Sequence, residues 1–158
     1  RLISEEDMVK QASEFAGTVP VRHLLPYWKT SNRYLFSGGS VNMRDAAVYA
    51  KEENWSKAVE LWKQTYETKK GKQKMYAAYN TALGYEMQDS IDTALEWALK
   101  AQTLAREKSK TDKKETGEIH NGTISYYIFI SMYVDELEKR KEGMARLNMQ
   151  MNRFDDDF

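Results

Sequence analysis

The C-terminal third of the chain carries a regular stripe of hydrophobic positions. Its members are spaced alternately three and four residues apart, and they are Ile130, Tyr133, Leu137, Arg140, Met144, Leu147, Met151 and Phe154. This heptad spacing is typical of a helix that packs along one seam. It predicts a single long helix over residues 117–152, in which Arg140 is the one charged member of the seam.

Four shorter helical patterns precede this helix. They predict helices over residues 41–53, 56–69, 72–87 and 90–108. Gly71 follows the second of them, as is typical of a residue that ends a helix in the left-handed conformation. The polar stretch SKTDKKETG, residues 109–117, has no apolar residue to bury and predicts a solvated loop.

The first 39 residues follow a different pattern. Ser4 can cap a helix over residues 4–16, which Gly17 and Pro20 interrupt. Residues 27–39 have no 3.6-residue period and lead into the flexible sequence SGGS. We therefore expect residues 1–39 to form an N-terminal helix and an irregular or extended connector.

The helical part contains an internal repeat. At a shift of 36 residues, AVYAKEENWSKAVELWKQT aligns with LGYEMQDSIDTALEWALKA. The alignment pairs Tyr49 with Tyr85, Ala58 with Ala94, Trp62 with Ala98 and Thr65 with Ala101. Small residues at such positions allow paired helices to approach closely, while the aromatic residues fill the gaps between them.

This repeat resembles the tetratricopeptide (TPR) family, which has small and aromatic residues at set positions of a helical hairpin. Ala82, Tyr85, Ala94 and Ala101 match that pattern in the second copy; in the first, Ala46, Tyr49 and Ala58 match, but Thr65 replaces the last Ala. The resemblance implies an all-α fold, an α–α superhelix over residues 40–158. Its repeats would span 40–71 and 72–108, and the helix over 117–152 would cap the open end, because two repeats alone leave apolar edges exposed.

A second resemblance concerns the run LLPYWKTSNRYLFSGGSVNMRDAAVYAKEENWSKAVELWKQTYE, a second repeat and a terminal RLNMQM. Together they are similar to a family of predicted lipoproteins from Bacteroidetes with TPR-like repeats at the C-terminal end. That resemblance implies export and a location in the cell envelope, facing the periplasm or the cell surface. The lipid-bearing Cys that it also implies is not part of this sequence.

Composition excludes several classes of function. Lys plus Arg and Asp plus Glu both number 24, so no net charge attracts nucleic acid. No apolar run reaches the roughly 18 to 20 residues that a membrane span requires. Cysteine is absent, which excludes disulfides and thiolate ligands within this stretch.

The sequence shows no catalytic arrangement and no metal or cofactor site. His23 and His120 are about a hundred residues apart, and neither has a carboxylate at a spacing that a motif requires. SGGS, residues 37–40, precedes a helix and could receive an anion, but it lacks the Lys of a P-loop and is better interpreted as a hinge and N-cap. We therefore predict that this chain is not an enzyme.

The candidate binding surface is the concave face that the first helix of each TPR repeat would form. The residues predicted to point there are Met43, Arg44, Tyr76, Tyr79, Asn80 and Leu83. The leading hypothesis is a protein-interaction or scaffold module with a protein or peptide partner. Two alternatives stay open: a carbohydrate- or peptide-binding protein that uses these aromatic residues, and an enzyme whose catalytic part lies outside this sequence.

The seam also bears on self-association. In a parallel dimer two Arg140 side chains would meet, whereas within one chain Arg140 could emerge at the margin of the seam with its stem along Tyr133 or Leu137. The sequence therefore predicts a monomer with an intramolecular seam.

Overall fold

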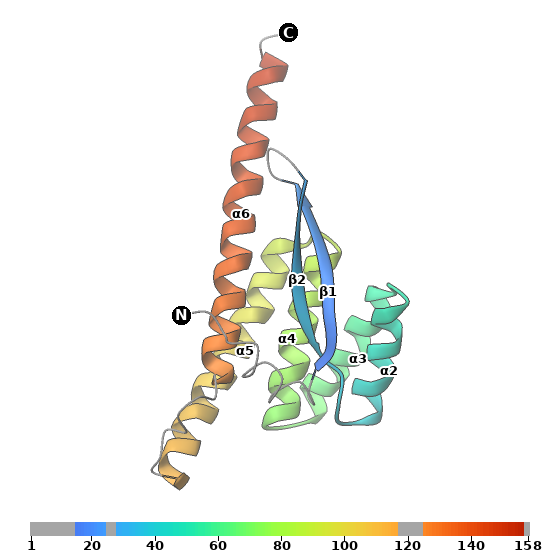
Figure 1. Ribbon diagram of the computed structural model, residues 1–158, viewed down its shortest axis with the longest axis vertical. Helices are drawn as coiled ribbons and strands as arrows, with labels where there is room; N and C mark the ends of the chain where they lie inside the picture. The colour runs from blue at the N-terminus through green and yellow to red at the C-terminus, as the bar shows by residue number, and fades with distance from the viewer. Residues whose placement is uncertain (1–14, 25–27, 117–124, 157–158) are drawn as a thin grey trace.

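The computed structural model describes residues 15–24, 28–116 and 125–156. Its elements are, in chain order, β1 (Phe15–Leu24), β2 (Trp28–Phe36), α2 (Val41–Lys51), α3 (Trp55–Thr68), α4 (Lys72–Met87), α5 (Ile91–Thr116) and α6 (Tyr126–Asp156). The fold is mostly helical, and a small β-hairpin lies over α4 and beside α6 (Figure 1).

The hairpin corrects the all-α prediction. β1 and β2 pair antiparallel, with Val19 opposite Arg33 and Pro20 opposite Asn32. Thr18, Val19 and Val21 favour strand over helix, and in a two-stranded sheet a proline costs little because each strand has an open edge. Most of the helix predicted over residues 4–16 lies outside the described residues, but its last two residues belong to β1. Of the connector predicted over residues 27–39, residues 28–36 form the extended strand β2.

Side-chain hydrogen bonds cap the starts of α2 and α3. Ser40 Oγ accepts a hydrogen bond from the Met43 backbone N–H at the start of α2, and Asn54 Oδ1 accepts one from Lys57 at the start of α3.

The prediction for α4 is confirmed at both ends, and those for α2 and α3 are confirmed to within two residues. The loop predicted over residues 109–117 is wrong, because α5 continues to Thr116. Lys and Glu are good helix formers, so the helix needs no apolar residue to extend.

The turns between paired helices recur at the spacing of the sequence repeat. Glu53 and Asp89, 36 positions apart, both adopt positive φ, at 59° and 60°. The next residue donates its backbone N–H back to a tyrosine carbonyl in each case, Asn54 to Tyr49 at 2.8 Å and Ser90 to Tyr85 at 2.9 Å. The repeated sequence thus folds into the same turn twice.

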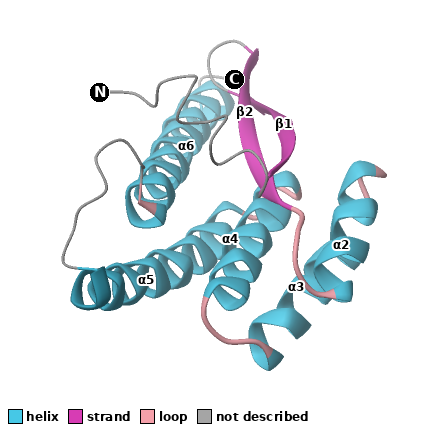
Figure 2. Ribbon diagram, turned by 60° about the horizontal axis from the view of Figure 1, so that its bottom comes forward, coloured by secondary structure: helices cyan, strands magenta, loops and turns pink. Residues whose placement is uncertain are grey.

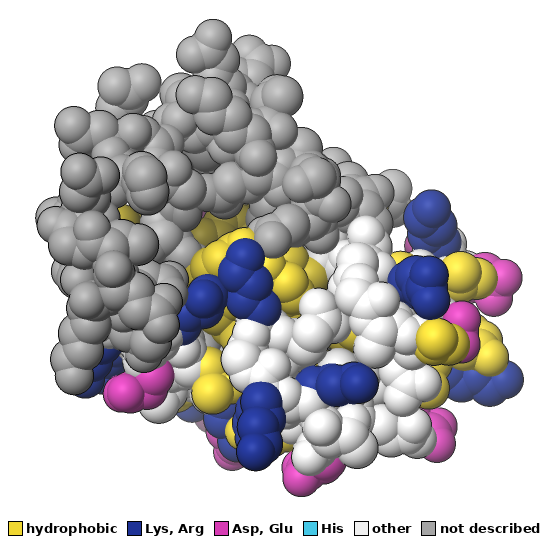
Figure 3. Space-filling view, turned by 90° about the horizontal axis from the view of Figure 1, so that it is seen from below, with side chains coloured by type: hydrophobic (Ala, Val, Ile, Leu, Met, Phe, Trp, Pro, Cys, Tyr) yellow, Lys and Arg dark blue, Asp and Glu magenta, His cyan; other side chains and the backbone are white. Residues whose placement is uncertain are grey.

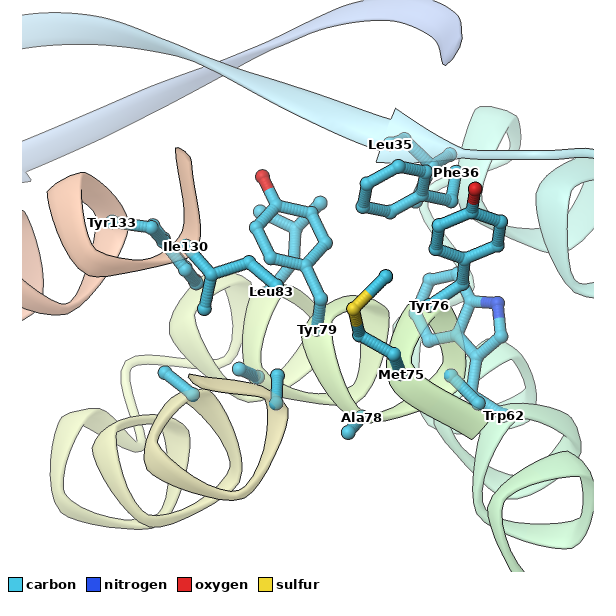
Figure 4. Packing of buried hydrophobic residues seen from close by; sticks show 14 of the residues in the cluster. Leu35, Phe36, Trp62, Met75, Tyr76, Ala78, Tyr79, Leu83, Ile130 and Tyr133 are labelled. Atoms are coloured by element: carbon cyan, nitrogen blue, oxygen red, sulfur yellow. The ribbon is translucent and has the colours of Figure 1, made fainter. Parts of the chain in front are cut away.

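Each helix packs against the next one along the chain, and α6 lies along α5 (Figure 2). Small residues lie where the helices approach: Ala58, Ala82, Ala94 and Ala101 are completely buried. Larger side chains such as Trp62, Met75 and Leu83 fill the space between α3, α4 and β2 (Figure 4). One hydrophobic core therefore joins the hairpin to the helices.

The seam of α6 divides into two halves. Ile130 and Leu137 are completely buried, whereas Met151 and Phe154 are 58% and 70% exposed. The C-terminal part of α6 extends past the other helices (Figure 1). Of the helices in the described parts of the chain, none is both long and apolar enough to cross a membrane.

Candidate functional site

The face of α4 that the sequence predicts for binding is filled by the chain itself. Tyr76, Tyr79, Asn80 and Leu83 lie on α4, and all four are buried beneath the end of β2 and the first turns of α6 (Figure 4). Met43, on α2, is also completely buried. Arg44 is exposed on the same helix and does not join the cluster. In this structure β2 covers the predicted face of α4. That a separate partner binds there remains a prediction.

Asn80 holds the end of β2 by its backbone. Its side-chain Oδ1 accepts a hydrogen bond from the Phe36 N–H at 3.1 Å, and its Nδ2 donates one to the Phe36 carbonyl at 2.6 Å. Asn80 and Phe36 are both completely buried. An amide that satisfies both backbone groups of one residue does what a neighbouring strand would do, because it offers one acceptor and one donor on the same side.

Aromatic rings surround the same residue. The Phe36 ring stacks on Tyr76 with centroids 4.1 Å apart, and Tyr79 meets it edge-on at 5.1 Å. The Tyr79 hydroxyl donates to the Tyr34 carbonyl at 2.8 Å. Burial raises the pKa of Tyr79 well above its ordinary value, an effect that the positive charge of Arg33 only partly offsets, so Tyr79 is a neutral donor. The site therefore contacts both the backbone and a side chain of the strand.

A buried charge cluster lies six residues beyond Asn80 on α4. Glu86 is completely buried, and its Oε1 accepts hydrogen bonds from Arg33 Nε at 3.0 Å and from the Tyr133 hydroxyl at 3.1 Å. Its Oε2 accepts from Arg33 Nη2 at 3.2 Å and from Arg140 Nη1 at 2.9 Å. Arg33 comes from β2 and Arg140 from α6, so one carboxylate ties the hairpin and the terminal helix to α4.

The environment fixes the protonation of these partners. Burial lowers the pKa of Arg33, but the charge of Glu86 and its hydrogen bond outweigh burial, and the pKa is raised overall. Burial and the nearby charge of Glu86 raise the pKa of Tyr133 well above its ordinary value. Arg33 is thus a permanent cation and Tyr133 a neutral donor.

The position of Arg140 corrects the sequence-based picture. Arg140 does not emerge at the margin of the seam; it is 6% exposed and pairs with Glu86. A second, weaker contact joins its Nη2 to Asp89 at 3.6 Å, and its Nε has no hydrogen-bond partner within the described residues. Arg140 therefore contacts its own chain through a buried ion pair instead of a solvated side chain, and the monomer stays a prediction.

Sequence reasoning missed Glu86 and Arg33. A signal for Glu86 was present, because the repeat aligns it with Ala50, a small residue that is 6% exposed. A charge at a buried position of a repeat requires an opposite charge, and the lone Arg140 of the seam was a candidate. Arg33 had no comparable signal, since it lies in a segment without a recognised period.

The carboxylate oxygens of Glu86 are fully used as hydrogen-bond acceptors. Both oxygens of Glu86 already accept two hydrogen bonds each, which leaves no free position for a substrate proton. The described residues contain no group of three or more His, Cys, Asp or Glu side chains that could hold a metal ion. The contacts of Asn80 and Glu86 hold β2 and α6 against α4.

The structure is thus a helical domain packed on the end of a β-hairpin. The contacts of Asn80 with Phe36 and of Glu86 with Arg33 join the two parts. The chain belongs to the family described as Domain of unknown function (DUF6340), whose model matches residues 44–139. A second family, described as Domain of unknown function (DUF8603), matches residues 1–36. Comparison with curated proteins and with solved structures gave no match.

Proposed function

We propose that this chain is a non-catalytic protein-interaction or scaffold module whose helical domain holds an extended polypeptide segment through Asn80. The observation that carries the proposal is the pair of hydrogen bonds from the Asn80 amide to the N–H and carbonyl of Phe36. Backbone contacts of this kind accept many sequences, whereas the stacked Tyr76 adds a preference for an aromatic side chain.

The family matches support a role in joining domains. The match to the second family ends at Phe36, the residue that Asn80 holds, and the match to the first begins at residue 44. The contacts of Phe36 with Asn80 and of Arg33 with Glu86 therefore join residues of two different family domains. Such an interface fixes the position of one domain relative to the other.

The TPR-like interpretation gives this role a structural setting. In a TPR-like superhelix the first helix of each hairpin lines a concave face, and α2 and α4, the first helices of the two hairpins, both contact β2 here. The repeated turns at Glu53 and Asp89 support the interpretation. The bacterial cell envelope is the proposed location, and it rests on the resemblance of the sequence to predicted lipoproteins.

A peptide is favoured over a carbohydrate as the ligand class. The alternative of sugar binding needs open aromatic faces, and Tyr76 and Tyr79 are 5% and 1% exposed. Charge gives no reason to prefer a nucleic acid, because the face in Figure 3 carries basic and acidic side chains among hydrophobic ones on the part drawn in colour.

The test separates the strand from the domain that holds it. A protease site is inserted between Gly38 and Gly39, where a side chain at Gly38 meets nothing within 4 Å. After cleavage, the N-terminal fragment should stay bound to the helical domain during gel filtration. An excess of a peptide with the sequence of residues 28–37 should then release it. Asn80→Ala should weaken retention by about tenfold, since two hydrogen bonds contribute about 1.5 kcal/mol or more.

Arg44→Ala is the matched control, because Arg44 lies at the predicted face but is exposed. It should leave retention unchanged. If the cleaved fragment separated from the parent as readily as from Asn80→Ala, the proposal would be wrong.

A further inference from the structure

Two aromatic rings from different helices meet at the surface of the helical domain. Tyr66 on α3 and Trp97 on α5 make an edge contact, with ring centroids 5.0 Å apart. Both side chains are half-buried, so part of each packs on the core and part reaches the surface. The two rings come together because α3 and α5 both pack on α4.

Three lysines place their ammonium groups over this pair of rings. Lys100 Nζ lies 4.1 Å from the Trp97 ring centroid and 5.8 Å from that of Tyr66. Lys63 Nζ lies 5.8 Å from the Trp97 centroid, and Lys74 Nζ lies 4.5 Å from the Tyr66 centroid. Lys63 and Lys74 therefore each share a ring with Lys100, and positive charges from three helices gather at one place.

This lysine patch lies apart from the face of α4 that β2 covers. Its members are Lys63, Tyr66, Lys74, Trp97 and Lys100. Lys74 precedes Tyr76 by two residues, so the helical period places it on nearly the opposite side of α4. A molecule that binds the patch would therefore not compete with β2.

No carboxylate of the described residues neutralises the lysines of the patch. Glu67 and Glu96 each lie four residues from one of them, Lys63 and Lys100, which is a spacing at which ion pairs form along a helix. Even so, none of the three lysines comes within 4 Å of a carboxylate oxygen in the described parts of the chain. Their ammonium groups lie over rings, whose faces attract a cation without neutralising its charge. The patch therefore favours an anionic ligand.

We propose that the lysine patch binds a short acidic segment of a partner protein. In an extended peptide, carboxylates two residues apart lie about 7 Å apart on the same side. That spacing suits ammonium groups gathered around two rings whose centroids are 5.0 Å apart. The methylene groups of glutamate side chains would contact the exposed parts of Tyr66 and Trp97. The chain thus has a second binding surface, which does not depend on how Asn80 holds β2.

An acidic peptide fits the patch better than other polyanions do. Leu99 is the one strongly exposed large apolar side chain in the described parts of α3, α4 and α5, so little apolar area is available to enter an anionic membrane. A long nucleic acid would also have to pass Glu67 and Glu96, which follow Tyr66 and precede Trp97 in the sequence. A peptide with a few carboxylates can bind between them.

Fluorescence anisotropy of a fluorescein-labelled hexaglutamate, titrated with the whole chain at low salt, tests the proposal. The dissociation constant should be in roughly the tens of micromolar and should rise at least about fivefold in about 0.5 M salt. Lys100→Gln should weaken binding by at least about fivefold, whereas Lys100→Arg should keep it within about twofold. Labelled hexaglutamine, which has the same length and no charge, should not bind.

Lys57→Gln is the matched control. Lys57 Nζ also lies over a ring, 5.3 Å from the centroid of Tyr49, so the substitution removes the same charge and the same kind of contact away from the patch. It should change the dissociation constant by less than about twofold. Equal effects of Lys57→Gln and Lys100→Gln would attribute binding to net charge and overturn the proposal.

Nuclear magnetic resonance of the labelled chain locates the ligand. Hexaglutamate should shift the backbone amide signals of residues 63–74 and 97–100. Shifts confined to other elements would overturn the proposal. Tighter binding of phosphatidylglycerol vesicles or of an oligothymidylate than of hexaglutamate would overturn it as well, since a membrane or a nucleic acid would then be the better ligand.

Discussion

Arg140 on α6 donates a hydrogen bond to Glu86 on α4 across 2.9 Å, and neither residue is more than 6% exposed. Residues 54 positions apart in the chain thus meet in the core as opposite charges. Arg33 reaches the same carboxylate from β2. This cluster, and not hydrophobic contact alone, determines how α6 and the hairpin sit on α4.

Glu86→Gln should destabilise the chain by about 3 to 5 kcal/mol, because two guanidinium groups would lose their buried counter-charge. Urea denaturation followed by circular dichroism measures the loss. Glu96→Gln is the control, since Glu96 is exposed on α5 and its change should cost less than about 0.5 kcal/mol. Equal stability of the Glu86→Gln variant and the parent would show that the cluster is dispensable.

Leu137→Asp should unfold the bundle or cost at least about 3 kcal/mol, since it buries an unpaired charge where the side chain is completely enclosed. Met149→Asp places the same charge on an exposed part of α6 and should be tolerated. Thermal melts of the two variants provide the comparison. A Leu137→Asp variant as stable as Met149→Asp would contradict the packing of α6 on the other helices.

Gly84→Ala should destabilise the chain by about 1 to 3 kcal/mol, although alanine is the better helix former. A Cβ at this position would collide with Val59 Cγ2 and lie 3.2 Å from Trp62 Cζ3. The close approach of α3 and α4 therefore requires glycine. Urea denaturation measures this loss, and a change in tryptophan fluorescence would report the shift of Trp62. A gain in stability would mean that the helices can separate at little cost.

Stability should fall at alkaline pH through the buried tyrosines. Burial raises the folded-state pKa of Tyr133, so above about pH 10 the unfolded chain releases this proton first and is favoured. Below that pH the tyrosine makes no pH-dependent contribution. Tyr133→Phe should remove up to about 1.4 kcal/mol of the loss per pH unit above pH 10, measured by urea denaturation from pH 8 to 11. An identical pH dependence of variant and parent would contradict the burial of this hydroxyl.

Most of the helical segments were predictable from local signals, but the C-terminal part of α5, which has no apolar residue to mark it, was not. Gly71, which the sequence placed after the end of α3, has a φ of 64° and directly precedes α4, so it marks the boundary between the two helices. Seam spacing likewise predicted one long helix, but its predicted bounds, residues 117–152, were wrong, because Ser125 caps the start and α6 spans Tyr126–Asp156. The hairpin was missed because Gly17 and Pro20 were interpreted only as residues that end a helix, whereas a proline is tolerated in an edge strand such as β1.

The site was predictable only in part. Tyr76, Tyr79 and Asn80 do share one face, as the helical period requires. Their occupant was not predictable, because Phe36 lies 44 residues away from Asn80 and no local pattern connects them. The same limit applies to Arg33 and Glu86, whose pairing depends on the tertiary fold.

Hydrogen exchange at the Phe36 amide tests most directly whether Asn80 holds the end of β2 on α4. This N–H donates to Asn80 Oδ1, so it should exchange at a rate close to that of the core amides of α4. In Asn80→Ala its protection should fall by about tenfold or more relative to those amides. A Phe36 amide that exchanges as fast as an exposed peptide in the parent, or equally in both proteins, would contradict the account.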